Sequence, residues 1–153
     1  MEEVFKIEGR HPLKGEVRIS GAKNATVALI PASILAGGPV TICGVPDIAD
    51  VESLAVLLKE LHVEVVHKDR GHLVIDPTGM RNIPLVHPAV TRLRASYYFM
   101  GALLGKYRQV KIKMSGGCYL GPRPIDLHLK GFEALGATID YQKGCYEIRA
   151  EEL

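Results

Sequence analysis

The sequence predicts an α/β fold built from repeated helix–strand–helix–strand–strand units, in which helices cover one face of a sheet. Apolar residues recur with the 3.6-residue period of a helix between Asp47 and Leu61. Short apolar runs such as Pro39–Cys43 separate the helical stretches and are bounded by glycine and proline. The same order of elements occurs twice along the chain, which indicates an internal repeat.

The first unit follows the segment EVRIS (16–20), which is typical of a strand. A helix is expected over 22–35, rich in Ala, Leu and Ile and ended by a Gly-Gly pair. A strand over 39–43 precedes a helix over 47–61. That helix places six apolar residues on one face: Ile48, Val51, Leu54, Leu57, Leu58 and Leu61. Two short strands, 63–66 and 73–75, enclose the polar turn KDRGH.

The second unit repeats this order with a helix over 94–104, a strand over 110–114, a helix over 125–135, and strands over 137–140 and 146–149. Pro39 aligns with Gln109 at an offset of 70 residues, and Leu61 aligns with Leu135 at an offset of 74. The second unit therefore has a longer loop between its strand and its second helix, SGGCYLGPR. Because such arrays need about three copies for stability, two copies predict an incomplete domain.

Composition and charge exclude several classes of partner. The 153 residues are 47% hydrophobic and 24% charged, with 19 basic and 17 acidic residues and a net charge of +2. Nucleic acids and anionic membranes select a stronger basic excess. The N-terminus has no apolar signal region, and no apolar run approaches the ~20 residues of a spanning helix. Three cysteines at no metal-ligand spacing indicate free thiols in a reducing cytoplasm.

Cys118 lies in the irregular loop of the second unit, between a Gly-Gly pair and the run GPRP. Glycine permits backbone conformations in which loop amides point at an anion. Arg123 is near in sequence and would favour the thiolate, so Cys118 is a candidate nucleophile or proton donor. The alternative is a surface-loop cysteine without a chemical role. Cys43 and Cys145, in or beside strands, are expected in or near the core.

Two helix starts are candidate anion sites. In GAKNA (21–25), Gly21 allows a tight turn, and the first helical amides have no partner inside the helix. Lys23 adds a cation and Asn24 an amide, which suits a phosphate or carboxylate, although no Walker sequence is present. Arg94 opens the corresponding helix of the second unit and aligns with Asn24. Ordinary solvated side chains at helix ends are the alternative.

The segment after Cys118 contains a stiffened arginine. Pro122 and Pro124 flank Arg123 and would fix its guanidinium for bidentate contact with an anion. Asp126 suits the first turn of the following helix on electrostatic grounds alone. His128 is expected to be structural rather than catalytic.

Four stretches together resemble the enolpyruvyl transferase family, and within it the carboxyvinyltransferases that act on UDP-N-acetylglucosamine. They are GEVRISGAKNA, GVPDIADVESL, RLRAS and GGCYLGPRPIDLHLKGFEALGA, in this order, within a resemblance that covers about 5–149. The resemblance implies two domains, each an inside-out α/β barrel of three repeats. Residues 22–153 would form the first two repeats of one domain. Residues 1–21 would pack partly on the second domain, and the third repeat and second domain would be absent.

The resemblance also implies a role for each matching residue. Cys118 matches the catalytic cysteine, which donates a proton to the enolpyruvyl methylene carbon and is alkylated by fosfomycin. Lys23 and Asn24 match the phosphoenolpyruvate-binding pair. The nucleotide sugar would contact Arg94, Arg123, Pro124, Ile125, Asp126 and Leu127. The chain departs from the family at Tyr119 and Pro122, which would stiffen the loop and slow its closure.

The implied activity is transfer of the enolpyruvyl group of phosphoenolpyruvate to the 3-hydroxyl of UDP-N-acetylglucosamine, with release of phosphate. This is the first committed step of peptidoglycan synthesis, which serves cell wall biogenesis, cell shape and division in the cytoplasm. No cofactor or metal is implied, and the remainder of the chain is the expected partner. The isolated fragment is expected to turn over little or nothing.

Two other functions stay open from the residues. A non-catalytic paralogue would bind a nucleotide sugar as a regulator or scaffold. An RNA-binding module of similar architecture would need a basic face, which the net charge of +2 does not indicate.

Overall fold

The computed structural model describes residues 4–69, 71–113 and 124–153. Its first unit contains α1 (Lys23–Ala32), η1 (Ser33–Leu35), β1 (Val40–Ile42), α2 (Ala49–Glu60), β2 (Glu64–Lys68) and β3 (His72–Asp76). Its second unit contains α3 (Pro88–Arg92), η2 (Arg94–Tyr97), α4 (Tyr98–Tyr107), β4 (Gln109–Lys113), α5 (Asp126–Ala134), β5 (Thr138–Gln142) and β6 (Cys145–Arg149). The α/β class and the order of elements predicted from the sequence are confirmed.

The two units carry sheets of the same topology. The strand orders are β1-β3-β2 and β4-β6-β5, and every pairing within them is antiparallel. Val40 lies opposite Ile75 in the first sheet, and Val110 lies opposite Ile148 in the second. The internal repeat is therefore a repeat of structure as well as of sequence.

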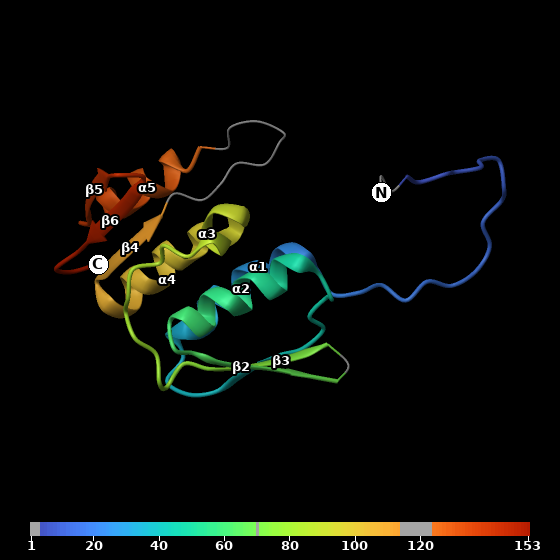
Figure 1. The fold of residues 1–153 in the computed structure, drawn as a ribbon, viewed down its shortest axis with the longest axis horizontal. Coiled ribbons are helices and arrows are strands. Elements are labelled where there is room, and N and C mark those ends of the chain that lie inside the picture. Colours follow the sequence, from blue (N-terminus) through green and yellow to red (C-terminus); the bar gives the residue numbers. More distant parts are fainter. Residues whose placement is uncertain (1–3, 70, 114–123) are drawn as a thin grey trace.

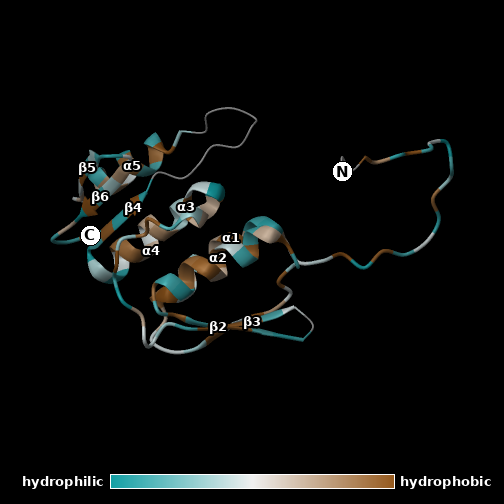
Figure 2. Ribbon diagram, in the orientation of Figure 1, coloured by the Kyte–Doolittle hydropathy of each residue, from teal (hydrophilic) through white to brown (hydrophobic). Residues whose placement is uncertain are grey.

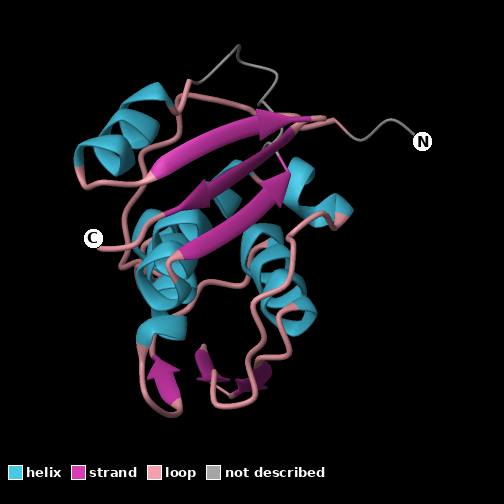
Figure 3. Cartoon of the chain, turned by 90° about the vertical axis from the view of Figure 1, so that its left-hand side faces the viewer, coloured by secondary structure: helices cyan, strands magenta, loops and turns pink. Residues whose placement is uncertain are grey.

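Helices lie between the two sheets (Figures 1 and 3). Apolar side chains from both units join in one core, and Leu54, Leu57 and Leu58 of α2 and Phe99 and Leu103 of α4 have no exposed surface. The hydrophobic stretches of these helices stand out in Figure 2. Removing this apolar surface from water, at about 25 cal/mol per Å², is what joins the units.

The second helices of the two units differ in burial. α2 buries Val51, Leu54, Ala55, Leu57 and Leu58, whereas no residue of α5 is fully buried. Leu127 and Leu135, in and just after α5, are 74% and 61% exposed. The ring of Phe132 lies beside Gly101 of α4, so α5 packs at the rim of the core rather than inside it.

Two expectations from the sequence were wrong. Residues 16–20 form no strand: Val17 and Ile19 are exposed, and no described strand pairs with them. The N-terminal segment extends away from the helices and sheets (Figure 1). A strand pattern without a pairing partner leaves its backbone groups to water, so it forms no sheet. Cys43 is exposed, because it follows the last residue of β1 rather than lying within the strand.

The short helix α3 was not expected. Pro88 occupies its first turn, where a missing N–H costs nothing, and His87 Nδ1 accepts a hydrogen bond from the Ala89 N–H at 3.1 Å. Before α3, Leu85 forms a parallel bridge with Ile112 of β4 through two backbone hydrogen bonds of 2.8 and 2.9 Å. The chain between the units therefore adds a short partner to the edge of the second sheet.

None of the helices in the described part of the chain is both long and apolar enough to cross a membrane.

A lysine of the second unit binds the 3₁₀ turn that follows α1 in the first unit. Lys106 of α4 donates a hydrogen bond from Nζ to the carbonyl oxygen of Ile34 in η1 at 2.7 Å, in a partly buried setting. The carbonyl end of a helix favours a cation, and this partly buried carbonyl oxygen accepts its hydrogen bond from the lysine ammonium group.

We expect Lys106→Met to lower the free energy of unfolding by about 1.5–3 kcal/mol, because it keeps the aliphatic stem but removes a charged hydrogen bond. Urea unfolding followed by circular dichroism measures the change. Lys59→Met is the matched control, since Lys59 is an exposed lysine of α2. Its effect should stay within about 0.5 kcal/mol. Equal effects of the two substitutions would contradict the role given to Lys106.

Candidate functional site

The first turns of α1 and α2 lie side by side at one end of the helical layer. Lys23 Nζ, in α1, is 2.5 Å from Asp50 Oδ2, in α2. No side chain caps the start of α1, where Ala22 holds the N-cap position. The helix therefore presents backbone N–H donors and a lysine ammonium at the same point, an arrangement that favours an anion.

Gly21 fixes the start of α1 against the loop that follows β1. A Cβ atom at Gly21 would lie 1.6 Å from the carbonyl oxygen of Gly44, which is far inside van der Waals contact. Gly44 itself has a φ of 71°, in the left-handed region that favours glycine. The two glycines let the loop after β1 pass directly over the backbone that leads to Lys23.

Asp50 is a site residue that the sequence analysis missed. The helix dipole is a sufficient reason for an acid in the first turn of α2, so the sequence alone gives this residue no further role. Lys23, its partner in the ion pair, is 27 positions away along the chain, and no sequence periodicity indicates such a pairing. With Lys23 more than half exposed, the ion pair contributes at most about 1 kcal/mol to stability. The ion pair holds the Lys23 ammonium group at the first turn of α1.

A second cluster, which we call the Arg94 cluster, contains Arg94, Tyr97, Tyr98 and His128. The Arg94 guanidinium carbon is 5.7 Å from the centre of the Tyr97 ring. The Tyr97 ring centre is 4.5 Å from that of Tyr98 and 4.8 Å from that of His128. Burial raises the pKa of the Tyr97 phenol, and interaction with Tyr98 raises it further, while the nearby Arg94 charge opposes the shift.

Arg94 carries an unsatisfied donor inside this cluster. Its Nε atom is buried, and no hydrogen-bond partner occurs among the described residues. A buried donor without a partner costs about 1–3 kcal/mol, more for a charged group. Arg94, a binding residue predicted from the sequence, thus lies beside aromatic rings with a buried Nε that has no partner in the described part of the chain.

The remaining predicted residues lie around the start of α5. Pro124 is exposed, Ile125 is buried, Asp126 opens the helix and Leu127 faces solvent. His128, the next residue, contacts Tyr97, which supports the structural role expected for it. Cys118 and Arg123, with Tyr119 and Pro122, lie outside the described residues. Lys23 and Asn24 stand at one helix start and Arg94 at the corresponding start in the second unit, as the offset of the repeat predicts.

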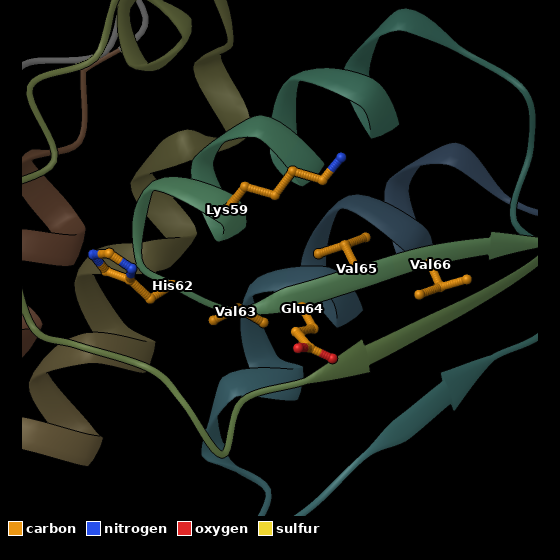
Figure 4. Close-up of a pocket in the computed structure, with 6 residues that line it drawn as sticks. All are labelled: Lys59, His62, Val63, Glu64, Val65 and Val66. Atoms are coloured by element: carbon orange, nitrogen blue, oxygen red, sulfur yellow. The ribbon is translucent and has the colours of Figure 1, made fainter.

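An open hollow elsewhere on the molecule contains none of these residues. It is lined by Lys59, His62, Val63, Glu64, Val65 and Val66, where the chain leaves α2 and enters β2 (Figure 4). The Val65 and Val66 side chains leave the strand on opposite faces. Within the ranges that the structure describes, no group of three or more His, Cys, Asp or Glu side chains is placed to hold a metal ion.

Comparison with known families shows which family the chain belongs to. The family model described as EPSP synthase (3-phosphoshikimate 1-carboxyvinyltransferase) matches residues 7–152. The chain belongs to this family. Among curated members, "UDP-N-acetylglucosamine 1-carboxyvinyltransferase 2" of Bacillus subtilis (strain 168) is 54% identical over 151 residues, or 99% of this chain. The protein of the same name from Oceanobacillus iheyensis is 54% identical over 147 residues.

This chain spans only about a third of the length of these family members: 35% of the Bacillus protein and 34% of the Oceanobacillus protein. The fold is found in solved structures too. The enolpyruvyl transferase NikO from Streptomyces tendae matches with a TM-score of 0.75 and 23% identity, over 92% of this chain and 31% of that one. EPSP synthase from Acinetobacter baumannii matches with a TM-score of 0.65 and 17% identity, over 90% and 32%. The enolpyruvyl transferase fold expected from the sequence is confirmed, as is the incompleteness of the chain relative to its family.

We expect Gly21→Ala to lower the free energy of unfolding by about 1–3 kcal/mol, because the new methyl group forces the loop after β1 away from the start of α1. Thermal or urea unfolding measures the loss. Gly37→Ala is the control, since a Cβ atom there meets nothing within 4 Å. If Gly21→Ala were as stable as Gly37→Ala, the close approach to Gly44 would not be a real constraint.

Proposed function

We propose that this chain is the N-terminal part of a transferase that moves the enolpyruvyl group of phosphoenolpyruvate to the 3-hydroxyl of UDP-N-acetylglucosamine. The observation that carries the proposal is 54% identity across 99% of the chain to a carboxyvinyltransferase named for that acceptor. The helix starts with Lys23 and Arg94 supply the kinds of group that two anionic substrates require.

Lys23 and Asn24 are proposed to bind phosphoenolpyruvate. The support is the uncapped start of α1 together with the Lys23 ammonium beside it. A phosphate or carboxylate at this point would accept hydrogen bonds from the free N–H groups and meet the positive end of the helix dipole. Asp50 would then share the ammonium with the substrate and keep it directed at the site.

The nucleotide sugar is proposed to contact Arg94 and the segment 123–127. Arg94 Nε has no partner in the part of the chain that the structure describes, which supports a ligand with acceptor oxygens, such as a diphosphate. Pro124, Ile125, Asp126 and Leu127 lead into α5, whose first turn is tied to the Arg94 cluster by His128.

The proposed reaction is an addition followed by an elimination. The sugar 3-hydroxyl oxygen attacks the enol carbon of phosphoenolpyruvate while a proton is added to the methylene carbon. The adduct then loses a proton from that same carbon, and the C–O bond to phosphate breaks, which restores the double bond and releases inorganic phosphate. Cys118 is proposed as the acid of the first step. Holding both substrates and clamping the phosphate would supply much of the acceleration.

The rest of the site is proposed to come from parts of the protein beyond these residues. The exposed apolar side chains at 127 and 135 leave α5 without the cover that α2 has, which supports a third repeat packed against it. Val4, Phe5, Ile7, Leu13, Val17 and Ile19 are also exposed, which supports packing of the N-terminal segment on the second domain. The 153 residues alone would then bind weakly and turn over little.

In the cell, we propose that the enzyme acts in the cytoplasm at the first committed step of peptidoglycan synthesis. It would thereby serve cell wall biogenesis, cell shape and division. Its partners would be the two small-molecule substrates and the remainder of its own chain, with neither nucleic acid nor membrane involved.

We expect the protein, expressed to its natural stop codon, to release phosphate from phosphoenolpyruvate only when UDP-N-acetylglucosamine is present. Cys118→Ala should lower the rate by at least about 100-fold, the range of a lost general acid. Cys145→Ala is the matched control, because Cys145 is a free thiol of β6 and is not among the residues proposed to bind or react. If the folded protein binds the nucleotide sugar but releases no phosphate, a non-catalytic paralogue becomes the better explanation.

We expect fosfomycin to add to Cys118 and to spare Cys43 and Cys145. The physical reason is that an epoxide reacts with a thiolate beside cationic groups faster than with an ordinary thiol. Peptide mass spectrometry after brief exposure measures the modified fraction of each cysteine. Equal modification of all three thiols would remove the support for a special site at Cys118.

A further inference from the structure

The orientation of the Arg94 guanidinium depends on the side chains that pack against it, because its Nε makes no hydrogen bond to the described residues. Arg94 opens η2 and is half-buried. An arginine side chain has many rotamers, and a guanidinium binds oxygen pairs well only when its plane is fixed.

Tyr97 contacts the guanidinium within the same turn. In a 3₁₀ helix, side chains three residues apart lie above one another, and Arg94 and Tyr97 have this spacing. The distance of 5.7 Å from the guanidinium carbon to the ring centre is within the ~6 Å range of a cation–π contact. The Tyr98 ring also packs on the Tyr97 ring, and the two ring planes are tilted by 34°.

Tyr97 also contacts the helix that carries two of the other proposed nucleotide-sugar residues, Asp126 and Leu127. Its ring meets His128 of α5 at 4.8 Å, with an angle of 61° between the rings, the edge-to-face arrangement that aromatic pairs prefer. His128 directly follows Asp126 and Leu127. One tyrosine therefore touches both an arginine at the start of η2 and the first turn of α5.

We propose that Tyr97 is a positioning residue for the nucleotide-sugar site: its ring fixes the Arg94 guanidinium and the first turn of α5 relative to each other. The proposal rests on the function proposed above, and it assigns Tyr97 no contact with the substrate. The aromatic ring, rather than the hydroxyl group, is the part that acts, because both contacts are made by the ring.

The test is a binding experiment on the full-length protein with UDP-N-acetylglucosamine, measured by titration calorimetry. Tyr97→Leu should weaken binding about tenfold, the upper range of a lost cation–π contact. Tyr97→Phe keeps the ring and should stay within about twofold of the parent. Tyr141→Leu is the matched control: Tyr141 also packs on another tyrosine, Tyr146, at 4.8 Å, but on β5. It should leave the affinity unchanged.

A double-mutant cycle separates positioning from a general loss of stability. In an Arg94→Gln background, Tyr97→Leu should cost no more than about a further twofold, because the group that it orients is already gone. In steady-state kinetics, Tyr97→Leu should raise KM for the nucleotide sugar and leave KM for phosphoenolpyruvate within about twofold. A general defect in folding would lower the amount of active enzyme, and so the apparent kcat, without raising the KM of one substrate selectively.

Each outcome decides the proposal. If Tyr97→Leu binds as the parent does, or if its effect adds fully to that of Arg94→Gln, Tyr97 is not a positioning residue. Should Tyr97→Leu fail to fold, His128→Ala tests the same link from α5, with an expected loss of about threefold; no loss would overturn the proposal. A parent protein that neither binds the nucleotide sugar nor releases phosphate overturns the proposed function itself, and this inference with it.

Discussion

The helical layer between the two sheets is the constraint on which the rest of the structure depends. Neither unit can cover the apolar faces of its own helices, so α1 and α2 pack against α3 and α4 and one core forms from both. Because the units repeat the same order of elements, packing them side by side also aligns their helices. Within the first unit, α1 and α2 also pack against each other, and at their starts Lys23 meets Asp50. The position of the candidate site follows from how the core is closed.

The two parts of the candidate site, at the start of α1 and at η2, differ in the hydrogen-bond donors that they offer. At α1, the donors are backbone N–H groups and a half-exposed lysine, and they suit a small, mobile anion. At η2, the donor is an arginine beside aromatic rings, with one buried N–H that has no partner among residues 4–69, 71–113 and 124–153. That environment suits a larger ligand that displaces water and presents oxygens at fixed positions. Corresponding positions of the repeat thus carry different side chains, and the second opens a 3₁₀ helix where the first opens an α-helix.

Local patterns predicted what is locally determined. The period of α2 and the offset between Pro39 and Gln109 were sufficient to find both units, since burial of a helix face leaves a regular trace in sequence. Residues 16–20 alternate like a strand but have no described partner, and a strand is defined by pairing that its own residues do not encode. α3 depends on a proline and a histidine cap in a segment too short for periodicity. The Lys23–Asp50 and Tyr97–His128 contacts join residues far apart in sequence, so only the folded chain reveals them.

The outer edge of β1 affects how readily the chain pairs with other chains while it is being synthesised. β4 is paired on that side by Leu85, whereas β1 pairs only with β3 among the described strands. An unpaired edge is a template for any strand that reaches it, and domains emerge from the ribosome N-terminal part first. β1 is only three residues long, against five in β4. A short edge offers few free N–H and C=O groups. The first unit is therefore a poor template for pairing with another nascent chain before the second unit has folded.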